Sequence, residues 1–462
     1  MSPPPEETAR PDGLTARIAA FICEGTRPPP GRLHHAKRHT LDTLAAIVSG
    51  AGLPAGQIAL ADILLSGDRQ EATVAGAAKR FPVQSAAYAN AMAAHADETD
   101  DAHPASVTHP GCAVVPAALA MAESRGATGA EMLAAIVIGY EICARIGTAL
   151  GGGRFIVERG FDSHSFGAVF GAAAAAATLA KLDRRQCQSV LSLAAHQAAG
   201  LATLFRDREH LEKAFVFAGM PARNGVAAVL SVERGLVGVD DVFDGSPSFF
   251  SAFGVDPEPA FADLGSRWAI ENTNIKRWCV GSPVQAALDS LKALMSEHGV
   301  GPDDIAAIEV SLPEEGASVV DDRDMPNVNL QHLIALMLVD GTVTFHNAHD
   351  RDRMSDERIL AERRKVRLIG SPELTRAEPA RQAIVELATH DGRTLRHRTR
   401  AVRGTVGNPM TDSELEAKFL GLVEPVLKRK RAGALAAAAW QLDKADNVEH
   451  ICALMNQPLE TG

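Results

Sequence analysis

The chain has few cysteines, and none of them is arranged as a metal or cluster ligand. No two form a CxxC pair, and the six lie far apart at Cys23, Cys112, Cys143, Cys187, Cys279 and Cys452. Zinc and iron–sulfur sites in proteins are usually built from closely spaced thiolates, so this spacing argues against both. Scattered thiols are typical of a reducing compartment, and we expect these to be buried.

The sequence also lacks a surplus of positive charge. It has 46 lysines and arginines against 57 aspartates and glutamates, which gives a formal net charge of −11. Nucleic acids and anionic membranes attract basic surfaces, so neither is expected as the main partner. A small anionic substrate is compatible with this balance, because a few local cations are enough to hold it.

Neither the N-terminal residues nor the uncharged run at 166–180 predicts a targeting segment or a membrane span. Residues 1–13, MSPPPEETARPDG, are polar and proline-rich, without the apolar stretch of a signal peptide. The uncharged run at 166–180, FGAVFGAAAAAATLA, is short for a bilayer and made mostly of alanine and glycine. Small side chains allow close helix packing, so we expect a central buried helix in a cytoplasmic protein.

The N-terminal half of the chain has the pattern of an all-helical domain. From Leu14 to about Leu264, apolar residues recur at helical spacing in an alanine-rich background, and several segments end at glycine. Helices are predicted over residues 16–25, 31–50, 114–126, 128–147, 167–182 and 222–235.

The pattern changes near Asn272 to a mixture of helices and strands. Helices are predicted at 282–299 and 329–341, and strands at 305–313, 364–370 and within 383–399. Asp391-Gly392 favours a type I′ hairpin turn, and the tail returns to helix at 412–427 and 432–443. The predicted fold is mainly α, with a large helical domain (1–269, with 401–462 packing back on it) and a smaller inserted α+β lid domain (270–400).

The densest group of functional side chains lies at 95–111, HADETDDAHPASVTHPG. It contains His95, Asp97, Glu98, Asp100, Asp101, His103 and His109. Such a run can be a solvated acidic loop, but alanine-rich apolar sequence on both sides favours a position close to the core. Carboxylates and imidazoles held there have shifted pKa values and suit acid–base catalysis. A divalent metal is a third interpretation, although the run matches no defined metal signature.

Two further groups carry charge or imidazole. His34, His35 and His39 fall on one predicted helix in a basic stretch, which is typical of a surface face. Arg206, Arg208 and His210 stand just before Lys213 and are candidates for contacts with an anionic substrate.

The polar run and three other segments resemble the MmgE/PrpD family in matching order, from about residue 14 to 460. The other segments are 165–183, 212–238 and 274–291. The family includes 2-methylcitrate dehydratase, cis-aconitate decarboxylase and iminodisuccinate epimerase. The resemblance implies a large helical domain, a smaller α+β lid, a homodimer, and chemistry on small polycarboxylates without a cofactor or metal.

The resemblance also implies roles for individual residues. His109, in Thr-His-Pro-Gly, matches the family's proton-transferring histidine, and Glu98 and Asp101 match part of its acidic motif. Lys276 matches a lysine that holds substrate carboxylates. Lys213 resembles a second such lysine, although it stands one residue further from Gly219 than the family motif has it.

At two places the chain departs from the family. Phe161 stands where the family often has a histidine, and His164 follows three residues later, either as its substitute or as a helix cap. His332 replaces a tyrosine of the decarboxylase, which suggests a different substrate or proton partner. Together with His103 and Arg206, His332 is expected to contact substrate.

The expected activity is that of a lyase of the dehydratase type, similar to 2-methylcitrate dehydratase. A carboxylate of residues 98–101, or His164, takes a proton next to a substrate carboxylate. Lys213 and Lys276 stabilise the resulting dianion, and His109 protonates the departing hydroxyl. A decarboxylase, an epimerase and a catalytically silent binding protein are the alternatives.

Overall fold

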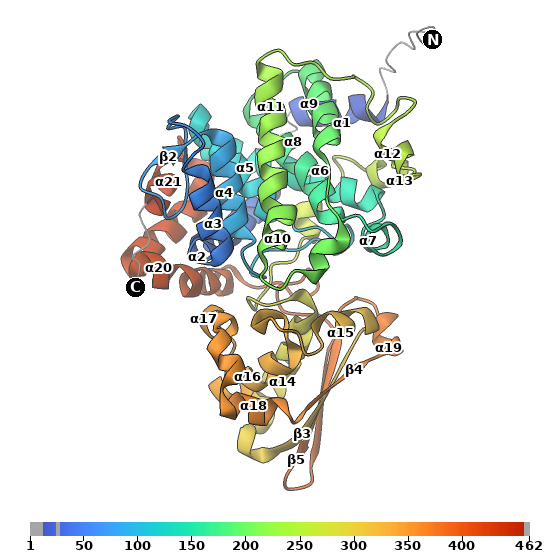
Figure 1. Ribbon diagram of the computed structural model, residues 1–462, viewed down its shortest axis with the longest axis vertical. Helices are drawn as coiled ribbons and strands as arrows, with labels where there is room; N and C mark the ends of the chain where they lie inside the picture. The colour runs from blue at the N-terminus through green and yellow to red at the C-terminus, as the bar shows by residue number, and fades with distance from the viewer. Residues whose placement is uncertain (1–12, 25–27, 457–462) are drawn as a thin grey trace. The chain divides into compact units, whose positions relative to one another are not determined.

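The structure is a computed structural model that describes residues 13–24 and 28–456 (Figure 1). Of residues 1–13, in which no signal peptide is expected, residues 1–12 lie outside the described part of the chain. The chain forms two compact units. Unit 1 comprises the described residues up to Ala96, then Asp101–Thr273 and those from Leu422, whereas unit 2 comprises Asp97–Asp100 and Asn274–Gly421.

Unit 1 is built almost entirely from helices, which confirms the predicted mainly α fold. Its helices are α1 (Leu14–Cys23), α2 (Pro30–Gly50), α3 (Pro54–Ile63), α4 (Val83–Ala94), α5 (Pro110–Arg125), α6 (Gly129–Ala149), α7 (Gly153–Arg159), α8 (Ser163–Leu179), α9 (Arg184–Gln197), α10 (Leu211–Ala214), α11 (Met220–Glu233), α12 (Phe249–Ala252), α13 (Glu258–Phe261) and α21 (Glu449–Met455). A two-residue ladder, β1 (Ala72–Thr73) with β2 (Arg80–Phe81), is a small exception to the all-helical prediction.

The alanine-rich α8 is the central helix of unit 1, as predicted. It packs against α5, α6 and α11 (Figure 1), and its alanines from Ala172 to Ala177 are at most 1 % exposed. Glycines let α6 and α8 approach closely, because a Cβ on Gly139 would lie 2.8 Å from the Gly171 carbonyl oxygen. Two helical segments of the described residues, α6 and Leu211–Glu233, are long and apolar enough to cross a membrane. The bent pair α2 and α3 would be a third such segment if it is counted as one span.

Unit 2 contains a four-stranded sheet and the helices that cover it. The strand order is β4 (Val366–Gly370), β3 (Ile305–Leu312), β5 (Ala383–Thr389), β6 (Thr394–Thr399), with only the β3–β4 pair parallel. Its helices are α14 (Gln285–His298), α15 (Glu314–Val320), α16 (Leu330–Asp340), α17 (Phe345–His349), α18 (Glu357–Arg363) and α19 (Pro372–Thr375). The apolar sides of α14, α16 and the sheet form one core.

The β5–β6 hairpin exists, but its predicted type I′ turn is wrong. The Thr389 N–H donates to the Arg393 carbonyl at 3.0 Å, which closes a three-residue loop. Within that loop only Gly392 has a positive φ, of 88°. Asp391 keeps an ordinary backbone because its carboxylate accepts from the Thr389 hydroxyl and from the Arg393 Nε. The loop therefore has the single left-handed glycine of a three-residue hairpin.

The two predicted tail helices are joined across a kink as α20 (Asp412–Trp440). Lys428 has φ 64° and ψ 154°, and Pro425 lies three residues before it. The non-helical backbone at Lys428 separates α20 into two helical segments, which agrees with the prediction of two tail helices. The chain passes from unit 2 to unit 1 within α20, between Gly421 and Leu422.

Arg145 ties α6 to the segment that follows α13. Its guanidinium contacts the Glu141 carboxylate at 2.6 Å, the Asp263 carboxylate at 2.7 Å and the Arg267 carbonyl at 3.0 Å. Because the Arg145 side chain is only 10 % exposed, its loss would leave buried Glu141 without its cation. We expect Arg145→Met to lower the free energy of unfolding by about 3–5 kcal/mol in urea titrations.

A surface pair in the same unit provides the control for this prediction. Arg125 contacts Glu233 at 2.6 Å, with 38 % of the arginine side chain exposed. Arg125→Met is expected to cost less than about 1 kcal/mol, since exposed ion pairs contribute little. Equal losses in the two variants would contradict a structural role for the Arg145 network.

Candidate active site

Most of the polar run 95–111 is buried, although Pro104 and Ala105 are exposed. Every residue from His95 to His103 is buried, and His95, Asp100 and Asp101 are 0 % exposed. The interpretation as a solvated acidic loop is therefore wrong. The run divides between the two units, because Asp97–Asp100 belong to unit 2 and its other residues to unit 1.

Four histidines of unit 1 form what we call the histidine cluster: His95, His109 and His164, which contact Phe217, and His210, which contacts His95. The ring centroids of His95–His109, His95–His210 and His109–His164 are each 5.2 Å apart. The His164 ring stacks on Phe217 with a centroid distance of 3.8 Å and an interplanar angle of 13°. His95, His164 and His210 are at most 6 % exposed.

Helix ends place these four side chains. His95 is the C-cap of α4, and His109 is the N-cap of α5, where Pro110 begins the helix. His164 lies in the first turn of α8, and His210 precedes α10 with a left-handed φ of 59°. A non-glycine residue held in this region is strained, and such strain is frequent at functional sites.

His164 is oriented by a buried carboxylate. Its Nδ1 lies 2.6 Å from Asp162 Oδ1, while Asp162 Oδ2 accepts from the Ser165 N–H at 3.0 Å and caps α8. Burial opposes ionisation of Asp162, but His164 and the Ser165 and His164 amides outweigh it and lower the pKa of Asp162. Because Nδ1 is committed to Asp162, Nε2 is the ring atom of His164 that remains for proton exchange.

Lys213 lies beside Phe217, the aromatic ring that this cluster contacts. Its Nζ lies 5.3 Å from the centroid of the Phe217 ring, on which His164 also stacks. Phe217 belongs to the π-helical turn Phe215–Gly219, and such turns occur often at functional sites. Arg206, also predicted to contact substrate, is exposed on the 3₁₀ turn Ala202–Arg206.

Asp101 lies outside the cluster and holds the start of α5. Its Oδ2 contacts His39 Nδ1 at 2.7 Å and accepts from the Tyr140 hydroxyl at 2.6 Å, and its Oδ1 accepts from the Gly111 N–H at 3.0 Å. Burial, together with the Asp101 charge, raises the pKa of Tyr140 well above its ordinary value. These bonds give Asp101 the geometry of a positioning residue for the helix that begins after His109.

The expectation that His39 lies on a surface face is wrong. Its ring is 2 % exposed and packs against Tyr140 at a centroid distance of 5.2 Å. A signal was present in the sequence, because His39 shares a helix face with Ala36 and Thr43, both fully buried.

His103 stabilises the turn that leads to His109. Its Nδ1 lies 2.8 Å from the Ser106 hydroxyl, and its N–H donates to the Thr108 carbonyl at 2.8 Å. Burial lowers the pKa of His103 to about 4, so its imidazole is neutral at pH 7. These contacts are internal to the loop.

In unit 2, Lys276 binds the acidic segment 97–100. Its Nζ donates to the Glu98 carbonyl at 2.9 Å and lies 3.3 Å from the Glu98 carboxylate and 3.5 Å from that of Asp100. Burial lowers the pKa of Lys276, but the two carboxylates outweigh burial and the net shift is upward. In this structure Lys276 and Glu98, both predicted site residues, are paired with each other.

His349 anchors the same segment. Its Nε2 lies 3.1 Å from Asp97 Oδ2, and its Nδ1 lies 2.6 Å from the Phe345 carbonyl. Burial lowers the pKa of His349, but Asp97 and the Phe345 carbonyl outweigh it and the net shift is upward. Sequence reasoning did not identify His349, because its partner lies more than two hundred positions earlier in the chain.

His332 is enclosed in unit 2. It is 0 % exposed on α16, and among the described residues neither of its ring nitrogens has a hydrogen-bond partner. Burial first, and then Arg363 and Arg353, lower the pKa of His332 to about 4.

A buried neutral imidazole makes stability depend on pH. Between an unfolded pKa of about 6.5 and the folded value of about 4, the unfolded chain binds a proton that the folded chain does not. The free energy of unfolding therefore falls as the pH drops through this window. The variant His332→Leu lacks this imidazole. From pH 7 to pH 5 we therefore expect the free energy of unfolding of the wild type to fall by about 2 kcal/mol more than that of the variant.

Denaturant titrations of both proteins at the two pH values measure this difference. The difference cancels contributions from His103 and other titrating groups, which both proteins share. Parallel pH dependences in wild type and variant would show that His332 is not held neutral by burial.

Comparison with known proteins covers nearly the whole chain. The model of the MmgE/PrpD N-terminal domain matches residues 16–262, and that of the MmgE/PrpD C-terminal domain matches residues 278–444. A cis-aconitate decarboxylase-like protein (oryM) of Aspergillus oryzae is 27 % identical, with 97 % of this chain and 98 % of the relative covered.

Two further relatives carry the name cis-aconitate decarboxylase. The protein of Mus musculus is 23 % identical over 93 % of this chain and 90 % of its own length. A protein of Aspergillus terreus is 24 % identical over 94 % of this chain and 93 % of its own length.

Proposed function

We propose that this chain, which belongs to the MmgE/PrpD family, is a lyase. The proposed reaction is the decarboxylation of a small unsaturated polycarboxylate. The observation that carries the proposal is the pair His109 and His164. Their rings are 5.2 Å apart, and His164 is oriented by the buried carboxylate of Asp162. Two adjacent imidazoles, one with a fixed tautomer, are suited to hold and deliver a proton.

In the proposed reaction, the bond between a substrate carbon and its departing carboxylate breaks, and carbon dioxide leaves. The electron pair stays on the substrate, where conjugation with a remaining carboxylate spreads the negative charge. His109 then transfers its proton to the carbanion and becomes neutral. Before this transfer, His164, which is held by Asp162, stabilises the positive charge of the protonated His109 ring.

Lys213 supplies positive charge beside these imidazoles. Its position over Phe217 places an ammonium group near the ring that His164 covers, within the same unit. A substrate carboxylate bound by Lys213 would be oriented towards the histidine cluster, and the developing negative charge would be stabilised. His95 also packs against Phe217, and His210 packs against His95.

The names of the relatives favour decarboxylation of cis-aconitate. His332 instead favours a substrate other than cis-aconitate. His332 stands where the sequence resemblance places a tyrosine of the decarboxylase, so a 2-methylcitrate dehydratase-like reaction is the second candidate. There, a base removes a proton from carbon, the carbon–oxygen bond breaks, and His109 protonates the departing hydroxyl to give water.

Proton NMR of the purified protein with cis-aconitate and, separately, with 2-methylcitrate distinguishes the two candidates. Loss of cis-aconitate signals with release of carbon dioxide supports decarboxylation. Conversion of 2-methylcitrate to an unsaturated acid without carbon dioxide supports the dehydratase instead. Binding of both compounds without conversion would contradict both candidates.

A further inference from the structure

Asp207 lies in an exposed segment of unit 1 but directs its carboxylate to the backbone. Residues 205–209 are exposed except for Asp207, which is half-buried. Its Oδ1 accepts from the Glu209 N–H at 2.9 Å, and its Oδ2 accepts from the Lys213 N–H at 2.9 Å. The two oxygens therefore hold the backbone on either side of His210.

The bond to Lys213 caps the helix that carries this lysine. α10, the π-helical turn and α11 form one helical run, Leu211–Glu233, and His210 is the residue before it. The His210 side chain makes no capping hydrogen bond, so Asp207 supplies the acceptor that an N-cap residue usually supplies. A carboxylate suits this place, because a helix N-terminus attracts negative charge.

The same two bonds enclose the strained backbone of His210. Its φ of 59° and ψ of 21° are unfavourable for a residue with a Cβ, and such a conformation persists only where the surroundings fix it. The buried His210 ring packs against His95 at a centroid distance of 5.2 Å. Asp207 thus stabilises the turn that brings His210 into the histidine cluster.

Asp207 completes a pattern that three helix starts of the cluster share. Asp101 accepts from the Gly111 N–H at the start of α5, and Asp162 accepts from the Ser165 N–H at the start of α8. In all three cases an aspartate, and not the adjacent histidine, binds an N–H of the first turn. The pattern indicates that these carboxylates hold the helix starts from which the site is built.

We propose that Asp207 is a positioning residue that sets the affinity of the site for the substrate carboxylate bound by Lys213. The inference rests on the proposed function, in which Lys213 binds that carboxylate. The Lys213 Nζ lies 5.3 Å from the ring centroid of Phe217, one helical turn further along the same run. Without Asp207 the first turn loses its acceptor, so the backbone that carries this long side chain is no longer fixed.

Isothermal titration calorimetry of the full chain with tricarballylate tests the proposal without turnover. This saturated tricarboxylate has no double bond through which a carbanion could be stabilised, so binding is measured apart from the reaction. The proteins compared are the wild type, Asp207→Ala, Asp207→Asn, Lys213→Met and the double variant Asp207→Ala/Lys213→Met. Asp183→Ala is the matched control, because Asp183 caps α9 through the Gln186 N–H at 2.8 Å and has no histidine partner.

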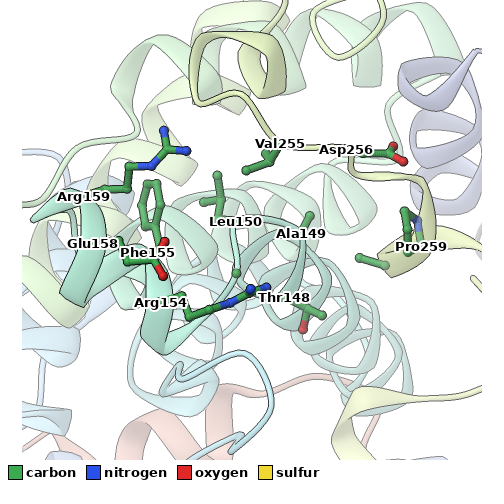
Figure 2. Close-up of a pocket in the computed structure, with 12 residues that line it drawn as sticks. Thr148, Ala149, Leu150, Arg154, Phe155, Glu158, Arg159, Val255, Asp256 and Pro259 are labelled. Carbon is green, nitrogen blue, oxygen red and sulfur yellow. The ribbon is translucent and has the colours of Figure 1, made fainter.

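A second control addresses binding of the anion elsewhere in unit 1. A cleft of about 490 Å³ beside α7 is lined by Arg154 and Arg159, among other residues, and by no member of the histidine cluster (Figure 2). Arg154→Gln lowers the positive charge of this cleft. Tricarballylate binding to Arg154→Gln is expected to equal that of the wild type.

We expect Asp207→Ala to weaken tricarballylate binding about tenfold, the effect of one displaced charge-assisted contact. Asp207→Asn should weaken it less, because asparagine keeps one acceptor oxygen. Lys213→Met should weaken it by a similar factor, and the double variant should bind no more weakly than Lys213→Met, because the two residues act as a unit. Asp183→Ala should lower the unfolding temperature about as much as Asp207→Ala and bind as the wild type does.

Three results would overturn the proposal. They are unchanged binding in Asp207→Ala, a loss that persists in full in the Lys213→Met background, and absence of binding to the wild type. A loss in Arg154→Gln instead of Asp207→Ala would likewise assign the anion to the cleft beside α7. Binding as expected by a protein that does not convert cis-aconitate would contradict the proposed reaction alone.

Discussion

Replacing His109 by glutamine is expected to lower kcat by roughly 10²–10⁴-fold, the usual contribution of a positioned acid. Glutamine keeps a polar side chain of similar length but cannot deliver a proton to a carbanion. His109 is the N-cap of α5 and makes no capping hydrogen bond with its side chain, so the helix start does not depend on the imidazole. The loss is therefore expected in catalysis and not in folding.

Steady-state kinetics on the converted substrate, together with thermal unfolding, separates these effects. His196→Gln is the control, because it removes an exposed histidine of α9 in the same unit. We expect its kcat to equal that of the wild type. If His109→Gln also retained the wild-type kcat, His109 would be removed from the mechanism.

Replacing Asp162 by asparagine is expected to lower kcat by about 10²-fold or more while the protein stays folded. The amide oxygen can still cap α8, because asparagine is a good N-cap residue. What is lost is the negative charge 2.6 Å from His164 Nδ1, which selects the tautomer and stabilises the imidazolium. The pH dependence of kcat should shift as well, because a group in the site loses its charged partner.

Asp183→Asn provides a matched control for this variant. Asp183 caps α9 in the same way, accepting from the Gln186 N–H at 2.8 Å, and it has no histidine partner. The two variants are expected to have similar unfolding temperatures and very different kcat values. A normal kcat and pH profile in Asp162→Asn would limit Asp162 to helix capping.

Local sequence features predicted much of the histidine cluster. His109 stands in a Thr-His-Pro-Gly motif at a helix start, and His95 lies in the polar run that apolar sequence encloses. His164 was weighed as a helix cap or a site residue, and the structure assigns the capping to Asp162 and places His164 in the cluster. Each of these signals is contained within a few residues of the chain.

Contacts between distant segments could not be predicted in the same way. Asp101 contacts His39 from 62 positions away, and Lys276 contacts Glu98 from 178 positions away. No local sequence pattern indicates that Lys276, which matches a substrate-binding lysine of the family, is paired with carboxylates of its own chain. Such pairing depends on which buried charges need partners once the core has formed.

The helices and strands were predicted well where periodicity is strong, as in α8 and β3. The errors lie where one side chain decides the backbone. Asp391 changes the hairpin loop through its hydrogen bonds. Residues 97–100 join unit 2 because Lys276 and His349 bind them, which periodicity does not reveal.

The most direct test of the central claim, that His109 delivers a proton to a carbanion left by decarboxylation, is the reaction of cis-aconitate in deuterium oxide. Proton and deuterium NMR should show the wild type forming one decarboxylated product with a single deuterium on carbon, and His109→Gln forming little or none. A product without carbon-bound deuterium, equal rates in both proteins, or no conversion by the wild type would contradict the account.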